Sequence, residues 1–353
     1  MAGYAARVTA IETTGLTKTF GGHAGPRPRP PFRRAAGIVR AVEDVTMDVV
    51  EGEVFGFLGP NGAGKTTAIR MLLGFLHPTS GRATVLGHDI VRESVEIRRK
   101  VGYLPGGVAL YDGLTGEEQL DYMAALAGRP AVRRSTLTER LELPARTLRR
   151  QVRDYSRGMR QKIGIVQALQ HDPELAVLDE PTEGLDPLMQ RAFYAILDDL
   201  RADGRTVFLS SHILSEVERV CDRVAIIRAG QIVALEDIGG LLARRKRNVE
   251  MRLSGPPPAL EGVAGVSGLA VADGRLTCRL EGDVGPFLAA IAGAPVTDLT
   301  IEPARLEEAF LEFYADEDGL PPEGAGRPDG ATAAPEARGP GDPAAISGGA
   351  PAQ

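Results

Sequence analysis

The sequence predicts an α/β fold built on a largely parallel sheet. Two short, mostly apolar runs, 175–178 and 206–209, each end in polar residues, which is typical of strands buried in a parallel sheet. Helical patterns lie between and after these runs, over 188–200 and 214–221. This alternation of strands and helices indicates an α/β layer architecture.

Length and composition favour a globular chain that contains two domains. The chain has 353 residues, of which 43% are hydrophobic and 25% charged, so it can bury a sizeable core. Its 41 basic and 47 acidic residues give a net charge of -6, and no nucleic acid ligand is expected. Cys221 and Cys278 lack metal-ligand spacing, which fits a reducing cytoplasm. No run of roughly 18 apolar residues occurs, so neither secretion nor a membrane span is expected.

The chain is expected to divide near residue 247, where the pattern of strands and helices changes. Helical spacing with breaks near Pro130 and Pro144 predicts a helical subdomain in the first domain. A loop rich in Gly, Pro and Arg is predicted over 21–37; a solvated insertion is favoured there over a contact with anionic lipid or a partner. The predicted parts are residues 8–247 with the helical subdomain at about 113–170, a small α/β domain over 248–315 that ends in a helix over 304–314, and a disordered tail over 316–353.

The segment 59–66 has the pattern GxxxxGK[ST] between a predicted strand, 54–58, and a predicted helix. Its glycines let backbone N–H groups converge on phosphate oxygens, and the helix start adds positive potential. Lys65 would neutralise the β- and γ-phosphates, and the Thr66 hydroxyl would coordinate Mg²⁺. A glycine-rich turn without chemical purpose is the alternative. The expected ATP-binding residues are Gly59, Pro60, Asn61, Gly62, Ala63, Gly64, Lys65, Thr66 and Thr67.

Asp179 and Glu180 follow a predicted buried strand, so they should lie at the sheet edge where ligands of open α/β sheets bind. Asp179 is the expected outer partner of Mg²⁺, and Glu180 the expected general base for the attacking water. A helix cap is the alternative explanation of an Asp-Glu pair in this position. Together with the glycine-rich loop, the two carboxylates predict a nucleoside triphosphatase.

Residues 155–162, with the sequence YSRGMRQK, open an apolar helical pattern. The Ser156 hydroxyl and the Gly158 N–H group at a helix start would make a phosphate-binding cap. A plain N-cap explains the same residues equally well.

The order of these motifs resembles that of the nucleotide-binding subunits of ABC transporters, over about residues 11–236. The segment 59–67 looks like their phosphate loop, 155–159 like the signature sequence, 175–181 like the hydrolytic strand, 184–186 like the D-loop and His212 like the switch histidine. The resemblance implies a P-loop NTPase cassette with a helical subdomain. It also implies a homodimer or heterodimer in which Ser156 and Gly158 of one protomer close on the ATP held by the other.

The resemblance assigns further roles and reveals two departures. His212 would contact the γ-phosphate and hold the attacking water with Glu180, and Asp186 would belong to the D-loop. Phe20 stands where the family has an aromatic residue that stacks on adenine; an ordinary core Phe is the alternative. Gly106 stands where the family has a glutamine that touches Mg²⁺ and water. The signature also carries Arg157 and Met159 where Gly and Gln are commonest.

The signature, Gly106 and the stretch 306–314 resemble the ATPase subunits of bacterial ABC-2-type exporters. This resemblance implies ATP-driven export of a small hydrophobic molecule, drug or lipid-like substrate through a separate ABC-2-type permease. The chain would then be peripheral on the cytoplasmic face of the membrane, with a permease coupling helix docked between Gly106 and Leu126. The alternatives are a soluble ABC ATPase acting on ribosomes or DNA, which usually has a second cassette or a long coiled coil, and a catalytically idle subunit.

Overall fold

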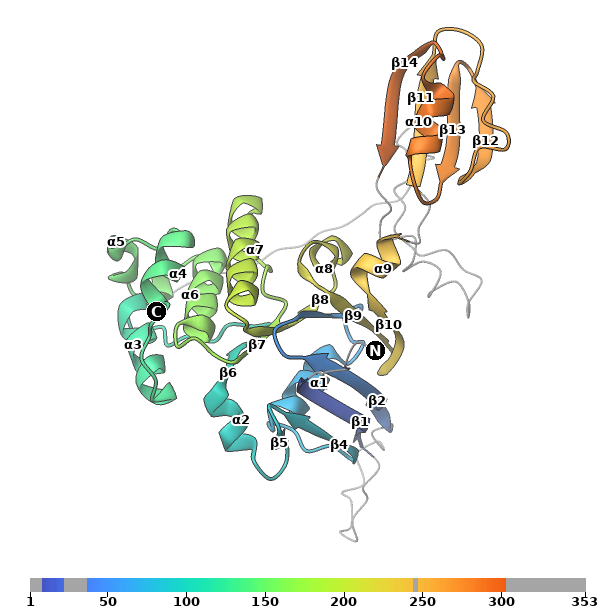
Figure 1. The fold of residues 1–353 in the computed structure, drawn as a ribbon. Coiled ribbons are helices and arrows are strands. Elements are labelled where there is room, and N and C mark those ends of the chain that lie inside the picture. The colour runs from blue at the N-terminus through green and yellow to red at the C-terminus, as the bar shows by residue number, and fades with distance from the viewer. Residues whose placement is uncertain (1–7, 22–36, 244–246, 303–353) are drawn as a thin grey trace, which may run out of the picture. The chain divides into compact units, whose positions relative to one another are not determined.

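The computed structural model describes residues 8–21, 37–243 and 247–302, which form the sheets and helices shown in Figure 1. Most of the predicted loop 21–37, the predicted helix 304–314 and the predicted tail 316–353 lie outside these residues. Among the residues that the structure describes, none of the helices combines the length and hydrophobicity that a membrane span needs.

The central sheet has the strand order β10-β9-β3-β8-β7-β6, and its strands are parallel except for β10 at one edge. The strands β3, β7 and β8 are buried along their whole length, which explains why they are nearly continuous apolar runs in the sequence. The predicted parallel α/β sheet is therefore confirmed. The bounds are β3 Val54–Leu58, β6 Val101–Leu104, β7 Leu175–Asp179, β8 Thr206–Ser211, β9 Arg223–Arg228 and β10 Gln231–Asp237.

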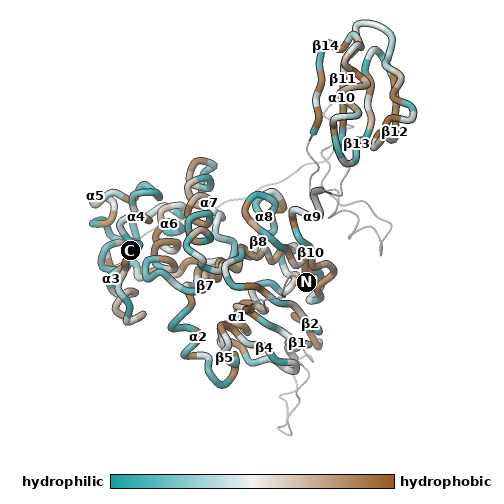
Figure 2. Tube along the Cα trace, in the orientation of Figure 1, coloured by the Kyte–Doolittle hydropathy of each residue, from teal (hydrophilic) through white to brown (hydrophobic). Residues whose placement is uncertain are grey.

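Each face of the central sheet packs into its own hydrophobic core. Phe55 and Phe57 of β3 belong to a core shared with α1 and an antiparallel sheet of order β2-β1-β4-β5. Val54 and Leu58 of the same strand belong to a second core shared with α6, α7 and α8. Alternation along one strand thus supplies both cores, and Figure 2 shows hydrophobic residues along the central strands. The added elements are β1 Thr9–Phe20, β2 Val39–Val50, α1 Lys65–Leu72, β4 Ser80–Val85, β5 His88–Asp89, α2 Ser94–Lys100, α7 Pro187–Ala202, α8 Leu214–Val220 and α9 Ile238–Ala243.

The segment between β6 and β7 is helical, as predicted. Helix α3 ends at Gly128, which has a φ of 63°, and Pro144 immediately precedes α5, so both predicted breaks occur. Leu120 of α3 and Leu137 of α4 contribute to the same core as α6. The bounds are α3 Gly116–Ala127, α4 Arg134–Arg140, α5 Ala145–Leu148, the 3-10 helix η1 Val152–Asp154 and α6 Arg157–Leu169.

The segment 247–302 forms a separate antiparallel sheet of order β12-β13-β11-β14 with its own hydrophobic core, which includes Met251, Leu276 and Phe287. A turn at Asp273-Gly274 joins β12 to β13 in an antiparallel hairpin. Strand β14 was not predicted, because its apolar alternation is interrupted near Asp298, where the register with β11 also shifts. The bounds are β11 Arg247–Leu253, β12 Val266–Ala272, β13 Arg275–Leu280, α10 Gly285–Ile291 and β14 Val296–Glu302.

Candidate active site

A cleft of about 660 Å³ opens beyond the carboxyl ends of β3, β6 and β7. This is the sheet edge at which open α/β sheets bind their ligands. Its lining combines the glycine-rich loop, the residues after β6 and β7, and the start of β2: Val39, Arg40, Ala41, Pro60, Asn61, Gly62, Gly64, Lys65, Thr66, Thr67, Arg70, Tyr103, Pro105, Gly106, Gly107, Asp179, Glu180, Glu183 and Ala229.

The glycine-rich loop reaches α1 through Gly64, whose φ is 109°. A Cβ atom at this position would lie 2.2 Å from the Ala41 carbonyl oxygen, so no other residue fits without moving the backbone. Gly64 is also the N-cap of α1, and within the described chain no side chain caps this helix and no acidic residue lies in its first turn. The N–H groups at the start of α1 can therefore bind an anion.

Lys65 and Thr66 begin α1 and reach the residues that follow β7. The Lys65 Nζ atom donates to the carbonyl oxygens of Gly59 at 2.5 Å and Pro60 at 3.3 Å, and it lies 3.2 Å from Glu180 Oε1. The Thr66 hydroxyl donates to Asp179 Oδ2 at 2.8 Å. The structure thus brings the adjacent residues Lys65 and Thr66 against Asp179 and Glu180, which lie more than 100 residues further along the chain.

Thr66 and Asp179 form an oxygen donor set suited to Mg²⁺. Asp179 is 1% exposed, and its other carboxylate oxygen accepts a hydrogen bond from the Ser210 hydroxyl, which orients it. No group of three or more His, Cys, Asp or Glu side chains that could hold a metal occurs in the described ranges. One hydroxyl and one carboxylate fit Mg²⁺, which keeps several water ligands and is bound through one or two carboxylates together with substrate phosphates.

Glu180 is held in an unusual backbone conformation beside the cleft. Its φ of 51° is left-handed, which costs a non-glycine residue about 1–3 kcal/mol and persists only where the surroundings impose it. Its N–H group donates to the Ser210 carbonyl at 3.1 Å. The Gln161 side chain donates to the carbonyls of Pro181 at 2.7 Å and Glu180 at 3.5 Å. These contacts fix the carboxylate at the cleft wall.

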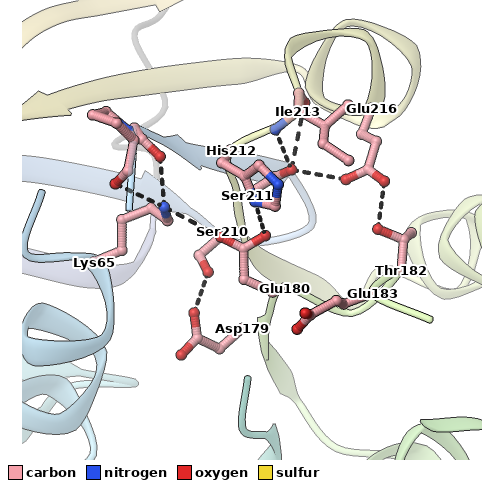
Figure 3. Close-up of polar contacts among 12 residues, drawn as sticks. Lys65, Asp179, Glu180, Thr182, Glu183, Ser210, Ser211, His212, Ile213 and Glu216 are labelled. Carbon is pink, nitrogen blue, oxygen red and sulfur yellow. Dashed lines mark hydrogen bonds and ion pairs between the residues drawn. The ribbon is translucent and has the colours of Figure 1, made fainter. Parts of the chain in front are cut away.

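The two carboxylate oxygens of Glu180 differ in their surroundings. The Oε2 atom lies 2.6 Å from His212 Nδ1. Figure 3 marks this contact with a dashed line. An ionised carboxylate only accepts hydrogen bonds, so Nδ1 carries the hydrogen in this contact. The Oε1 atom is buried and accepts no hydrogen bond from the described residues; Lys65 Nζ is close but outside hydrogen-bond geometry. One oxygen is thus held by His212, and the other lies beside the Lys65 ammonium without a hydrogen bond.

In the single chain, Ser156 and Asp186 each cap the start of a helix. The Ser156 hydroxyl accepts from Met159 N at 3.3 Å at the start of α6. Asp186 accepts from two N–H groups, each at 3.0 Å, at the start of α7. A Cβ atom on Gly158 would lie 2.9 Å from the Gly184 carbonyl oxygen, so glycine is also required for packing. These residues do not line the cleft. The contacts of Ser156 and Gly158 with nucleotide stay a prediction, as does the place of Asp186 in the D-loop.

Phe20, predicted to stack on adenine, lies at the end of β1 and is 40% exposed. It does not line the cleft, although its cross-strand partner Val39 does. The Lys18 ammonium lies 5.3 Å from the centre of its ring. The exposed position disagrees with an ordinary core Phe, and stacking on adenine stays a prediction.

Arg70 and Tyr103 line the cleft but were not anticipated from the sequence. Burial and the negative charge of Asp179 raise the pKa of Tyr103, and the charge and hydrogen bond of Arg70 oppose this shift. Tyr103 lies in β6, which pairs in parallel with β7. Predicting the residues before Gly106 as a strand of the same sheet would have placed Tyr103 at this edge. A Cβ atom on Gly106 would lie 3.3 Å from Asp179 Oδ2, so a glutamine at 106 would project beside the Asp179 carboxylate.

The sequence matches the family model described as ABC transporter over residues 42–183. The daunorubicin resistance ATP-binding protein DrrA3 of Streptomyces coeruleorubidus is 35% identical over 295 residues, which cover 80% of this chain and 93% of that protein. The bacitracin transport ATP-binding protein BcrA of Bacillus licheniformis is 36% identical over 249 residues, which cover 70% of this chain and 76% of that protein. A solved ATP binding subunit of an ABC transporter superposes with a TM-score of 0.57 at 31% identity, covering 66% of this chain and 92% of that chain. With this similarity and this cleft, the chain belongs to the family of ABC transporter ATP-binding proteins and is an ATPase of that class.

Proposed function

We propose that this chain is the ATP-hydrolysing subunit of an exporter, and that it drives a small hydrophobic molecule, drug or lipid-like substrate through a separate ABC-2-type permease. The observation that carries the hydrolytic part is the cleft lined by Lys65, Thr66, Asp179 and Glu180, with His212 in contact with the Glu180 carboxylate. Each of these groups matches one task of phosphoryl transfer: charge neutralisation, metal binding and water activation.

The residues of the cleft divide the hydrolytic step among them. The N–H groups of the glycine-rich loop and Lys65 bind the phosphates and offset their negative charge. Glu180 would accept the proton of the attacking water, while His212 holds Oε2 and so fixes the direction of the carboxylate. Thr66 and Asp179 would hold Mg²⁺, which would further neutralise the phosphate oxygens.

The proposal includes a homodimer or heterodimer of cassettes. Ser156 and Gly158 lie at the start of α6 and do not reach the cleft of their own chain. A second cassette would bring an equivalent helix start, with its partial positive charge, onto the bound ATP. Two ATP molecules would then be sandwiched per dimer, with Asp186 close to the contact between the two chains.

The permease would dock at a groove of about 560 Å³ beside the cleft. Phe75 and Leu126, which both line this groove, are 52% and 63% exposed, and exposed apolar patches mark interaction sites. Tyr103 and Pro105 line both the groove and the cleft, so they form a shared wall through which a docked coupling helix would sense the nucleotide. The lining is Leu73, Phe75, Arg98, Val101, Tyr103, Pro105, Met123, Leu126, Ala127, Gln167, Ala168 and His171.

The export of small molecules is supported by the relatives. DrrA3 is a daunorubicin resistance protein and BcrA a bacitracin transport protein, so two similar cassettes serve two unlike compounds. The cargo is therefore expected to be selected by the permease. The chain would act from the cytoplasmic face of the membrane, bound to that permease.

The test is to purify Glu180→Gln protein with ATP from detergent-solubilised native membranes and identify what accompanies it by mass spectrometry. Without its general base, the variant should bind ATP but retain it, which keeps the dimer closed. A polytopic membrane protein in near-stoichiometric amount is the expected result. Only ribosomal or DNA-bound partners would show instead that the cassette serves the soluble class of ABC ATPase.

A matched control tests the docking groove. Glu180→Gln/Leu126→Glu protein places a charge in the groove and leaves the residues of the cleft unchanged. It should still bind ATP, yet the membrane protein should be lost from the purified sample. Recovery of the same membrane protein in the same amount would move the docking site elsewhere.

A further inference from the structure

Glu216 is a buried acidic residue of α8 that lies outside the cleft. It is 5% exposed, and both oxygens of its carboxylate accept hydrogen bonds from hydroxyl groups. The Thr182 hydroxyl donates to Oε1, and the Ser211 hydroxyl donates to Oε2 at 2.8 Å. Figure 3 shows this carboxylate between the two chain segments.

The two donors adjoin the two residues of the proposed water-activating pair. Thr182 follows Glu180 by two residues, and Ser211 immediately precedes His212. One carboxylate therefore connects the turn that carries the general base to the strand end that carries its histidine partner. The 2.6 Å contact between His212 and Glu180 closes the same ring of residues on the side of the cleft.

Further groups enclose the Glu216 carboxylate. Burial, together with the charge of Glu216 and a hydrogen bond to it, raises the pKa of Tyr194 in α7 to about 12. Arg219, in the next turn of α8, lies with its guanidinium 5.4 Å from the centre of the Tyr194 ring. The carboxylate is thus held by groups from α7, from the end of β8 and from the turn after β7, so its position is well determined.

The turn at Glu180 needs support from both sides. Its left-handed φ of 51° is maintained on one side by Gln161. On the other side, the hydrogen bond between Thr182 and Glu216 restrains the same turn. The His212 side chain is 42% exposed, so packing alone holds it weakly and its direction depends on the backbone around Ser211.

We infer that Glu216 is a positioning residue for ATP hydrolysis: it sets the geometry of the Glu180–His212 pair without touching the nucleotide. The inference rests on the proposed roles of Glu180 and His212. A displacement of about 1 Å in such a pair is enough to slow a reaction roughly 100-fold, even when the change lies away from the chemistry. Nucleotide binding through the glycine-rich loop does not depend on this contact.

The test compares full-length wild type, Glu216→Ala and Glu216→Gln with Glu139→Gln, which removes an exposed carboxylate on α4. Binding of a fluorescent ATP analogue, steady-state ATP turnover with Mg²⁺ and thermal unfolding are measured for each protein. We expect Glu216→Ala to lower kcat about tenfold or more, with nucleotide Kd changed less than about twofold. The kcat of Glu216→Gln should lie between those of wild type and Glu216→Ala, because its amide keeps one acceptor oxygen. The kcat of Glu139→Gln should match that of wild type.

A double-mutant cycle distinguishes positioning from a purely structural role. If Glu216 acts through the Glu180–His212 pair, Glu216→Ala should cause little further loss of turnover in a His212→Ala background. The inference would be overturned if the two substitutions lowered turnover by the product of their separate effects, or if Glu216→Ala protein had the kcat of wild type. If Glu216→Ala does not fold, Thr182→Val and Ser211→Ala each remove one hydrogen bond and should show smaller losses with the same pattern.

A different result would refute the proposed function, as distinct from the positioning role of Glu216. Wild-type protein that binds the ATP analogue but turns over no ATP, alone or with its membrane partner, would refute hydrolysis itself. Normal wild-type turnover with an unaffected Glu216→Ala variant would refute only the positioning role.

Discussion

Helices α1 and α3 begin in opposite ways. Helix α3 has a complete capping box, in which the Thr115 hydroxyl accepts from Glu118 N at 3.2 Å and the Glu118 carboxylate accepts from Thr115 N at 2.8 Å. Helix α1 begins after Gly64, and in the described chain it has no side-chain cap and no acid in its first turn. The N–H groups that α3 satisfies internally are left at α1 for a ligand.

The difference shows that an N–H group at a helix start can bind a side-chain cap or an anion, but not both at the same time. A good N-cap contributes about 1 kcal/mol to stability, and α1 forgoes this contribution. In return, the start of α1 keeps its partial positive charge accessible beside Lys65. Four changes would break or sharpen this contrast.

The largest effect is expected from Gly64→Ala. The new Cβ atom would lie 2.2 Å from the Ala41 carbonyl oxygen at a φ of 109°, so the loop must move and its N–H groups lose their common direction. Binding of a fluorescent ATP analogue should weaken more than about 100-fold, with a stability loss of about 2 kcal/mol or more by thermal or urea unfolding.

Gly62→Ala is the matched control for Gly64→Ala. Gly62 also has a positive φ, 83°, but nothing lies within 4 Å of the position that a Cβ atom would take there. Backbone strain alone should therefore cost about 1–2 kcal/mol, with a smaller loss of nucleotide affinity. Equal effects of the two substitutions would mean that the close contact with Ala41 is not what demands glycine.

The second change gives α1 the acid that α3 has. Thr67 occupies the third position of α1, as Glu118 does in α3, and it lines the cleft. Thr67→Glu should lower affinity for ATP about 10- to 100-fold by placing a carboxylate against the phosphates. Thr67→Gln, of the same length but uncharged, should lower affinity less. Equal losses would show that size rather than charge is responsible.

The third change concerns α6. In the single chain its start is capped by a side chain, as that of α3 is, but across the proposed dimer it would bind ATP, as the start of α1 would. The Ser156–Met159 hydrogen bond is long, at 3.3 Å, so Ser156→Ala should cost less than about 1 kcal/mol of stability. ATP turnover should nevertheless fall roughly tenfold, because the hydroxyl is expected to contact ATP held by the partner chain. Unchanged turnover would leave Ser156 as a plain helix cap.

These helix starts also show how far the sequence could predict the site. The start of α1 follows from a local pattern, since glycines, lysine and threonine within eight residues define both the loop and its chemistry. The burial of Asp179 at the sheet edge follows from the apolar run before it. Such features depend on neighbours in the sequence, and local patterns are sufficient for them.

The contacts between distant segments could not be predicted in the same way. Resemblance to a family indicated that His212 approaches Glu180, although the two are 32 residues apart. No pattern indicated that Glu216 would receive the Thr182 hydroxyl, or that Gln161 would hold the carbonyl of Pro181. These contacts depend on how α6 and α8 pack against the turn after β7, which is set by the hydrophobic core as a whole.

The smallest effect is expected from Thr115→Ala, which removes the cap of α3. The substitution deletes the hydroxyl that accepts from Glu118 N and should lower the free energy of unfolding by about 1 kcal/mol, measured by urea denaturation. Affinity for the ATP analogue and the rate of turnover should not change, because α3 does not line the cleft. A loss of affinity from this change would contradict the division of roles between the two helix starts, since it would make α3 part of the nucleotide site.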